Sequence, residues 1–278
     1  MEGIAGSVPG KAEVAAGGSP ECEPMGASEG VPASAIATYL SGYLEVGNFK
    51  DYCPNGLQVE GAGPVRRIVS GVTASEALIR CAIRERAQAL LVHHGYFWRG
   101  EDPSLTGVRR RRIRLLLEND IHLFAYHLPL DAHPVVGNNA CLGRMFGWSP
   151  ERRFGDQQLG CWSTLARPVS PARLVASISR RLGRKALAVG SPPDLIRTVA
   201  WCTGAAQDML DQAIEAGADA FVSGEISERT VHLAREAGVL YVAAGHHATE
   251  RFGVRALGEH LAERFRIEHL FIDDPNPV

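Results

Sequence analysis

Three short clusters of histidines and acids stand where predicted strands end or predicted helices begin. They read L-L-V-H-H-G-Y-F-W, with His93 and His94; A-Y-H-L-P-L-D-A-H, with His127, Asp131 and His133; and A-A-G-H-H-A-T-E-R, with His246, His247 and Glu250. Neutral imidazole nitrogens and carboxylate oxygens are the ligands that zinc, manganese, iron and related divalent ions take in proteins. A metal site that holds two ions is therefore the first hypothesis about function.

The first cluster ends a near-continuous apolar strand, A-L-L-V-H-H. Open α/β sheets place ligand sites at the carboxyl ends of their strands, where the chain can turn so that both rings face one crevice. Adjacent His93 and His94 would then suit two neighbouring metals, one ring for each. Taken alone, the pair is equally compatible with two partly buried histidines that hydrogen-bond to the backbone.

The second cluster ends the predicted strand I-H-L-F-A-Y. Pro129 predicts a shaped loop here, because proline prevents an ordinary helix through the segment. The Asp131 carboxylate can ligate a hard divalent ion, and His127 is predicted either to bind the metal or to orient a ligand from behind. His133, directly before Pro134, is predicted to be a loop residue.

The third cluster follows the predicted strand V-L-Y-V-A-A and contains the start of a helix. His246 and Glu250 are four residues apart, which puts them on one helical face and lets both reach the same cavity. Glu250 has two oxygens and could bridge two cations, whereas His247 would point elsewhere and is predicted to be structural. One such pair is usually an ordinary surface pair, so the argument depends on three clusters occurring together.

Charge and composition narrow the other classes of function. The formal net charge is −2, which gives no overall attraction to nucleic acid or anionic membrane. The run Arg109–Arg112 falls on a predicted helix, so a solvated or subunit-contact face is favoured over a nucleic-acid site. No apolar run reaches the length of a membrane span. The six cysteines are scattered, which predicts reduced thiols in a cytoplasmic protein.

Strands and helices alternate along the chain from about residue 33 onwards. Fully apolar strands such as R-I-V-S-G-V, separated by helices such as 107–118, predict an α/β fold with mainly parallel sheets covered on both faces. Residues 148–198 are less regular and richer in Pro and Gly, and are predicted to be an insertion or small subdomain. Residues 1–30 carry few large apolar side chains and are predicted to be a disordered tail.

Long motifs spread over the chain resemble one known family. They include D-Y-C-P-N-G-L-Q-V-E-G, V-H-H-G-Y-F-W, H-L-P-L-D-A-H-P-x-x-G-N-N-A, D-A-F-V-S-G-E-I-S-E and A-G-H-H-A-T-E-R. From about Tyr39 to the C-terminus the sequence resembles the NIF-three-like metal-binding proteins, also called GTP cyclohydrolase 1 type 2 homologues, and is close to the enterobacterial-type members. The resemblance implies a dinuclear metal site whose ligands are His93, His94, Asp131, His246 and the bridging Glu250.

The same resemblance implies two α/β lobes of mainly parallel or mixed sheets flanked by helices, with the metal site in the crevice between the lobes. The predicted first lobe, residues 31–135, carries His93, His94 and Asp131. The predicted second lobe is 136–245 and includes the irregular segment 148–198, and the return segment 246–278 completes the site. A homohexameric ring is also implied.

The predicted function is a metal-dependent hydrolase that acts on a small molecule, possible substrates including a nucleotide such as GTP. Two divalent metals, with zinc, iron, manganese and nickel all fitting the ligands, would lower the pKa of a bridging water. His127 is the predicted catalytic proton shuttle. The alternative is a non-catalytic metal-binding scaffold or regulatory adaptor ring, and a nucleic-acid partner or a membrane partner is not expected.

Overall fold

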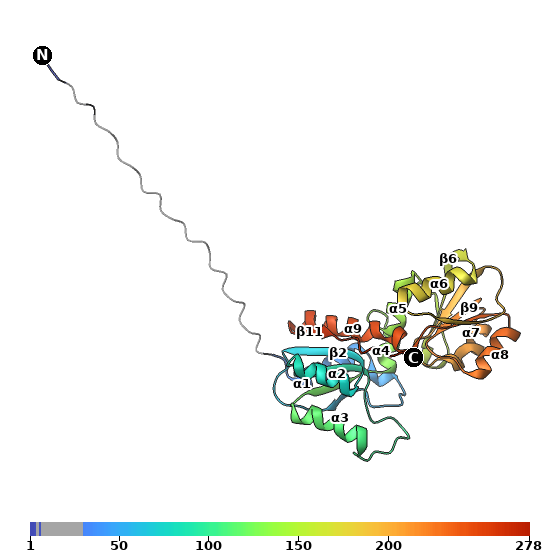
Figure 1. Ribbon diagram of the computed structural model, residues 1–278, viewed down its shortest axis with the longest axis horizontal. Coiled ribbons are helices and arrows are strands. Elements are labelled where there is room, and N and C mark those ends of the chain that lie inside the picture. Colours follow the sequence, from blue (N-terminus) through green and yellow to red (C-terminus); the bar gives the residue numbers. More distant parts are fainter. Residues whose placement is uncertain (4–5, 7–29) are drawn as a thin grey trace.

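Two mixed β-sheets, each covered by helices on both faces, form the two lobes of the molecule (Figure 1). The computed structural model describes residues 1–3, 6 and 30–278. The predicted disordered tail, residues 1–30, therefore lies almost entirely outside the described residues. The predicted α/β fold with two lobes of mixed sheets is confirmed.

The first sheet has the strand order β1-β4-β3-β2-β11, and all its neighbours are parallel except the edge strand β1. Alternate strand residues face opposite sides: Ile68 packs against α1 and α9, whereas Val69 packs against α2 and α3. The elements of this lobe are α1 (Ala33–Tyr43), η1 (Val46–Asn48), β1 (Gly56–Val59), β2 (Arg67–Thr73), α2 (Glu76–Arg84), β3 (Ala89–His94), α3 (Gly107–Glu118), β4 (His122–Ala125) and β11 (Glu268–Phe271).

The second sheet has the order β5-β6-β8-β9-β10-β7, with a parallel centre and antiparallel strands towards both edges. Helix α6 packs on one face with Val199, and α7 and α8 pack on the other face with Phe221. The elements of this lobe are β5 (Arg152–Phe154), η2 (Asp156–Gln158), β6 (Gly160–Val169), α6 (Pro171–Leu182), β7 (Leu187–Gly190), β8 (Ile196–Trp201), η3 (Gln207–Met209), α7 (Leu210–Glu215), β9 (Ala220–Ser223), α8 (Glu228–Glu236) and β10 (Leu240–Ala243).

The segment 148–198 is not a separate subdomain, so that part of the interpretation is wrong. It supplies β5, β6, α6, β7 and the start of β8, and these strands pair within the second sheet. The irregular appearance has a physical cause. Antiparallel edge strands are exposed on one side and joined by Pro- and Gly-rich turns, so they lack the continuous apolar runs of buried parallel strands.

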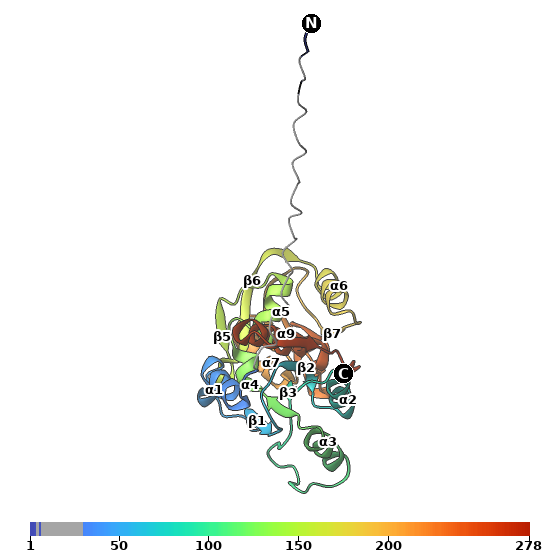
Figure 2. The ribbon, with the colours of Figure 1, turned by 90° about the vertical axis from the view of Figure 1, so that its left-hand side faces the viewer.

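Three helices connect the lobes: α4 (Leu128–Ala132), α5 (Asn138–Phe146) and the long α9 (His246–Phe265). Helix α9 begins directly after β10 of the second sheet and leads to β11 of the first, and it lies near the centre of the molecule in both views (Figure 2). The predicted loop at Pro129 is instead the short helix α4. Proline occupies its first turn, where a backbone N–H has no helical partner to lose.

Candidate metal centre

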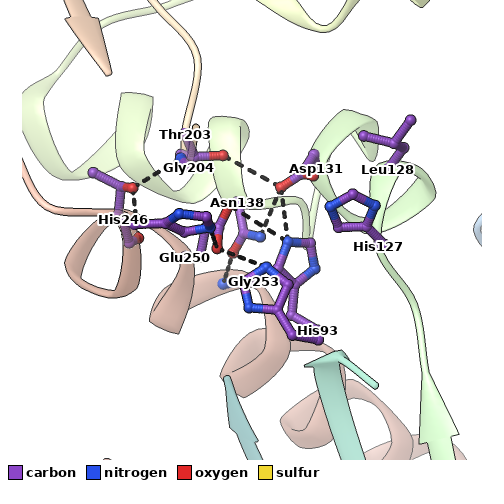
Figure 3. Close-up of polar contacts among 12 residues, drawn as sticks. His93, His127, Leu128, Asp131, Asn138, Thr203, Gly204, His246, Glu250 and Gly253 are labelled. Carbon is purple, nitrogen blue, oxygen red and sulfur yellow. Dashed lines mark hydrogen bonds and ion pairs between the residues drawn. The ribbon is translucent and has the colours of Figure 1, made fainter. Parts of the chain in front are cut away.

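All five predicted metal ligands come together between the lobes. Figure 3 labels four of them, His93, Asp131, His246 and Glu250. His93 and His94 end β3, Asp131 lies in α4 just after β4, and His246 and Glu250 occupy the first turns of α9. The three clusters thus meet because the carboxyl ends of β3, β4 and β10 point to the same region, as expected for ligand sites in α/β proteins.

Glu250 lies at the centre of this group. Its Oε2 atom is 2.9 Å from His246 Nε2 and 3.2 Å from His94 Nε2, and its Oε1 atom is 3.6 Å from His93 Nε2. His93 Nε2 is in turn 3.5 Å from Asp131 Oδ1. The ligand atoms therefore form two groups of three, His93–Asp131–Glu250 and His94–His246–Glu250, which share the Glu250 carboxylate.

Two buried atoms of the centre make no hydrogen bond of acceptable geometry, although Glu250 Oε2 lies 2.9 Å from His246 Nε2. They are His93 Nε2 and Glu250 Oε2, and the two residues are 0% and 3% exposed. A buried polar atom that makes no hydrogen bond costs free energy, so such atoms in a folded protein need an explanation. A cation between the imidazole nitrogens and carboxylate oxygens would satisfy both atoms, and this donor set fits a first-row divalent ion.

The opposite ring nitrogens of the three histidines are held by other groups. These contacts are His93 Nδ1 to the Tyr126 carbonyl at 2.8 Å, His94 Nδ1 to Thr73 Oγ1 at 3.2 Å, and His246 Nδ1 to Glu225 Oε1 at 2.6 Å. The carbonyl at His93 and the carboxylate at His246 can only accept, so they place the proton at Nδ1 and leave the Nε2 lone pair for a metal, and the Thr73 hydroxyl can accept from His94 in the same way. Glu225, two residues after β9, thus orients His246.

Asp131 is oriented by the second lobe and by α5. Asn138 Nδ2 donates to Asp131 Oδ1 at 2.8 Å, and the Thr203 hydroxyl approaches the same oxygen at 3.3 Å. The Oδ1 atom of Asn138 accepts from the backbone N–H of Gly253 in α9 at 2.9 Å. One buried amide therefore ties the carboxylate to the helix that carries Glu250.

Without a metal ion, the buried carboxylates and imidazoles of the centre shift one another's pKa values strongly. Burial opposes charge on every member, yet the Asp131 and Glu250 carboxylates raise the pKa of His93 to about 9. Burial lowers the pKa of His94 to about 4, and burial raises the pKa of Asp131. The neighbouring imidazoles hold the pKa of Glu250 well below its usual range, despite its burial. Protons here compensate two buried carboxylates, which is the role a metal cation would take over.

His127, the predicted catalytic residue, lies beside the five ligands but faces a different partner. Its ring centre is 5.0 Å from that of His93, and its Nδ1 atom is 2.7 Å from Asp51 Oδ1. Burial opposes ionisation of Asp51, but its hydrogen bond and ion pair with His127 lower the pKa of Asp51 to about 2. Asp51 and His127 also group with Cys53, whose burial raises the thiol pKa to about 12 and leaves it a poor ligand at neutral pH.

Glycine at position 204 leaves room for this arrangement. A Cβ atom there would lie 2.0 Å from Glu250 Oε1 and 3.3 Å from His246 Nε2, and the backbone φ of +70° is one that other residues rarely adopt. The backbone at Thr203 and Gly204 therefore lies close against the Glu250 carboxylate. Sequence reasoning did not single out this pair.

The remaining residues of the three clusters, and the arginine run, lie outside the centre. His247 Nε2 is 2.7 Å from Asp273 Oδ1, which fits the expected structural role, and His133 Nδ1 accepts backbone N–H groups just after α4. On α3, Arg109 pairs with Glu101 and Arg111 with Glu76. Two of the four arginines of the run are thus ion-paired on α3.

A cavity of about 380 Å³ adjoins the candidate metal centre. His127 and Asp131 line it, together with His246 and Glu250 of α9 and several residues between Cys202 and Met209 of the second lobe. A larger cavity of about 450 Å³ lies between α5, β6 and α6 and includes none of the five predicted ligands. The crevice between the lobes is therefore the place where a small molecule would meet these groups.

A family model described as Duf34/NIF3 (NGG1p interacting factor 3) matches residues 31–277. The chain belongs to the DUF34/NIF3 family. A member of similar sequence is the Pseudomonas aeruginosa protein named GTP cyclohydrolase 1 type 2 homolog. It is 53% identical over 253 residues, which cover 89% of this chain and 99% of that protein. The Escherichia coli K12 protein of the same name is 51% identical over 229 residues, covering 82% and 92%. The family resemblance is thus confirmed.

Solved structures of similar proteins share the fold. One is described as protein ybgI of unknown function, with a TM-score of 0.86 and 48% identity over 88% of this chain and 99% of that one. Another, TTHA1606 from Thermus thermophilus, has a TM-score of 0.81 and 34% identity over 88% and 99%. Among the described residues, no helix combines the length and apolar character needed to span a membrane.

Proposed function

We propose that this protein is a metal-dependent hydrolase that holds two divalent ions with His93, His94, Asp131, His246 and Glu250. The observation that carries the proposal is the sharing of Glu250 between two groups of three candidate ligands. Its Oε1 faces His93 and its Oε2 faces His94 and His246, which is the arrangement expected of a bridging carboxylate. Zinc, iron, manganese and nickel all suit this mixture of nitrogen and oxygen donors.

Bound divalent ions would supply Lewis-acid activation of water and of the substrate. The chain itself supplies orientation and exclusion of bulk water. His93 and Glu250 are buried, and the groups at Nδ1 of each histidine fix the direction of its Nε2 lone pair. The relatives' shared name, GTP cyclohydrolase 1 type 2 homolog, is consistent with hydrolysis but does not by itself fix the substrate.

His127 is the proposed proton carrier. Asp51 accepts at Nδ1 of His127, and Asn55 Oδ1 accepts the His127 backbone N–H at 2.7 Å, so the ring is held in one orientation. With its proton at Nδ1, the ring has Nε2 available as a base on the cavity wall. In hydrolysis, the oxygen of water bonds to the electrophilic atom of the substrate while His127 takes the proton of water and delivers it to the leaving group.

The proposed nucleophile is water and not a side chain. Cys202 lies on the cavity wall, but burial raises the pKa of its thiol well above the usual range, so the reactive thiolate is scarce at neutral pH. The sequence contains no G-x-S-x-G motif. Activity is therefore expected to survive thiol alkylation and serine-directed reagents but not removal of the metal.

The proposal is tested by an unbiased hydrolase substrate screen on metal-reconstituted full-length protein, with GTP among the compounds. Turnover is expected to disappear with chelator, to return with divalent metal, and to be absent in His93→Ala. A matched control is His232→Ala, because His232 is exposed and pairs only with Glu228 on α8. Metal binding without turnover of any compound class would instead favour the non-catalytic scaffold, and turnover that resists chelator would contradict the proposal.

A further inference from the structure

The cavity beside the candidate metal centre is apolar and acidic. Leu128, Leu159 and Met209 form apolar parts of its wall, and Asp156 and Asp208 add two carboxylates to those of the centre. The lining residues all lie in the described part of the chain, and none of them is a lysine or an arginine. A ligand that extends away from the centre therefore meets negative charge.

The two additional carboxylates differ in how far they are neutralised. Asp208 Oδ1 pairs with Arg229 Nη2 at 2.5 Å, an exposed ion pair. Asp156 has only the amide of the adjacent Gln157, with its Nε2 at 3.5 Å. The two proposed divalent ions would more than compensate Asp131 and Glu250, so the negative charge that remains in the cavity is that of Asp156 at its rim, away from the ions.

The backbone next to Asp156 has a conformation that residues other than glycine rarely adopt. Gln157 and Gln158 have φ values of 49° and 57°, both in the left-handed region. The Gln157 side chain accepts from the backbone N–H of Lys50 at 2.7 Å and donates to the Lys50 carbonyl at 3.2 Å, which joins the second lobe to the first beside the cavity. Backbone strain that is held in place this way is typical of ligand-binding segments.

We infer that this cavity selects uncharged or cationic small molecules with an apolar part, and that its acidic rim excludes polyanions such as nucleoside triphosphates. The inference rests on the proposed function and names its substrate class. In ring-opening of a purine nucleotide, the reacting ring atom must lie near His127 and Glu250. Phosphates that extend into the part of the cavity lined by Asp156 would find no lysine or arginine in the lining to receive them.

The test measures binding to metal-reconstituted full-length protein by ligand-observed NMR, using size-matched neutral, cationic and anionic fragments together with guanosine and GTP. Wild-type protein is expected to bind neutral and cationic fragments more tightly than their anionic matches, and guanosine more tightly than GTP. The exposed Asp156 is then replaced in Asp156→Lys. This change of two charge units is expected to strengthen anions relative to cations by about tenfold.

A second variant removes a competing site. The separate cavity carries Arg167, Arg173 and Arg180, so all measurements are repeated in an Arg167→Ala/Arg173→Ala/Arg180→Ala background, where binding of anions by these arginines is lost. Tighter binding of anionic fragments or GTP than of their neutral matches in that background overturns the inference. An anion-to-cation ratio that is unchanged by Asp156→Lys overturns it as well. The assay measures binding and does not depend on turnover. If the protein shows the expected charge selection but hydrolyses no compound, the proposed hydrolase activity is refuted and the inference about charge selection stands.

Discussion

Asn138→Ala is expected to destabilise the protein and to weaken its metal site together. The change removes the hydrogen bonds of Asn138 to Asp131 Oδ1 and to the Gly253 N–H, both buried. Two hydrogen bonds contribute about 2 kcal/mol, and the loss of a donor to the buried Asp131 oxygen adds on the order of 1 kcal/mol. The free energy of unfolding is therefore expected to fall by about 3 kcal/mol, which corresponds to a melting temperature about 10 °C lower.

The assay is urea unfolding in chelator, followed by calorimetric titration of the folded variant with divalent metal. Loss of the group that orients Asp131 is expected to weaken metal binding by roughly 10- to 100-fold. The matched control is Asn48→Ala, whose amide bonds only Glu45 at an exposed site and whose loss is expected to change stability by less than about 0.5 kcal/mol. An Asn138→Ala protein that is within about 1 kcal/mol of wild type, or that binds metal normally, refutes this reasoning.

Four further outcomes are expected. Gly204→Ala places a methyl group against Glu250 and is expected to weaken metal binding at least tenfold in a calorimetric titration. The control Gly42→Ala, where a Cβ meets nothing within 4 Å, is expected to leave metal affinity unchanged. Equal affinities of the two variants would contradict the argument that Gly204 must approach Glu250 closely. Asp51→Asn is expected to lower turnover roughly 10- to 100-fold at unchanged metal content, because it releases the His127 ring; unchanged kcat would remove His127 from the mechanism. Burial lowers the pKa of His269 below its usual 6.5, so the unfolded state binds more protons and stability is expected to fall as pH drops below about 6.5. Urea unfolding measured from pH 8 to about pH 5 is expected to show a shallower fall in stability for His269→Gln. A fall identical to that of wild type would show that His269 does not cause this pH dependence. We also propose the hexameric ring that the family resemblance implied, and light scattering that gives a monomer mass at micromolar concentration would contradict it.

Local patterns in the sequence were enough to find the elements and the predicted ligands. Helix α3 spans Gly107–Glu118, the range predicted from its basic and apolar spacing. The apolar strand A-L-L-V-H-H is β3, and the third cluster does contain a helix start, at His246. These features depend on residues that are close in the chain, and hydrophobic periodicity reports them directly.

Contacts between distant parts of the chain could not be derived in the same way. Asn138 reaches Gly253, 115 residues away, and Asp51 reaches His127, 76 residues away. Neither Asn138 nor Asp51 has an unusual local pattern, although both lie within motifs that carried the family resemblance, D-Y-C-P-N-G and G-N-N-A. The helix at Pro129 was missed for another reason: proline excludes a helix interior but is accepted in a first turn.

The metal content of purified full-length protein tests the central proposal most directly. Elemental analysis after reconstitution with excess divalent metal and desalting is expected to give two ions per chain in wild type. Glu250→Ala is expected to lose both, because its carboxylate belongs to both groups of ligands. The control Glu259→Ala, which removes only an exposed pair with Arg255, is expected to keep both ions. One ion or none in wild type, or two ions retained in Glu250→Ala, would contradict a dinuclear centre bridged by Glu250.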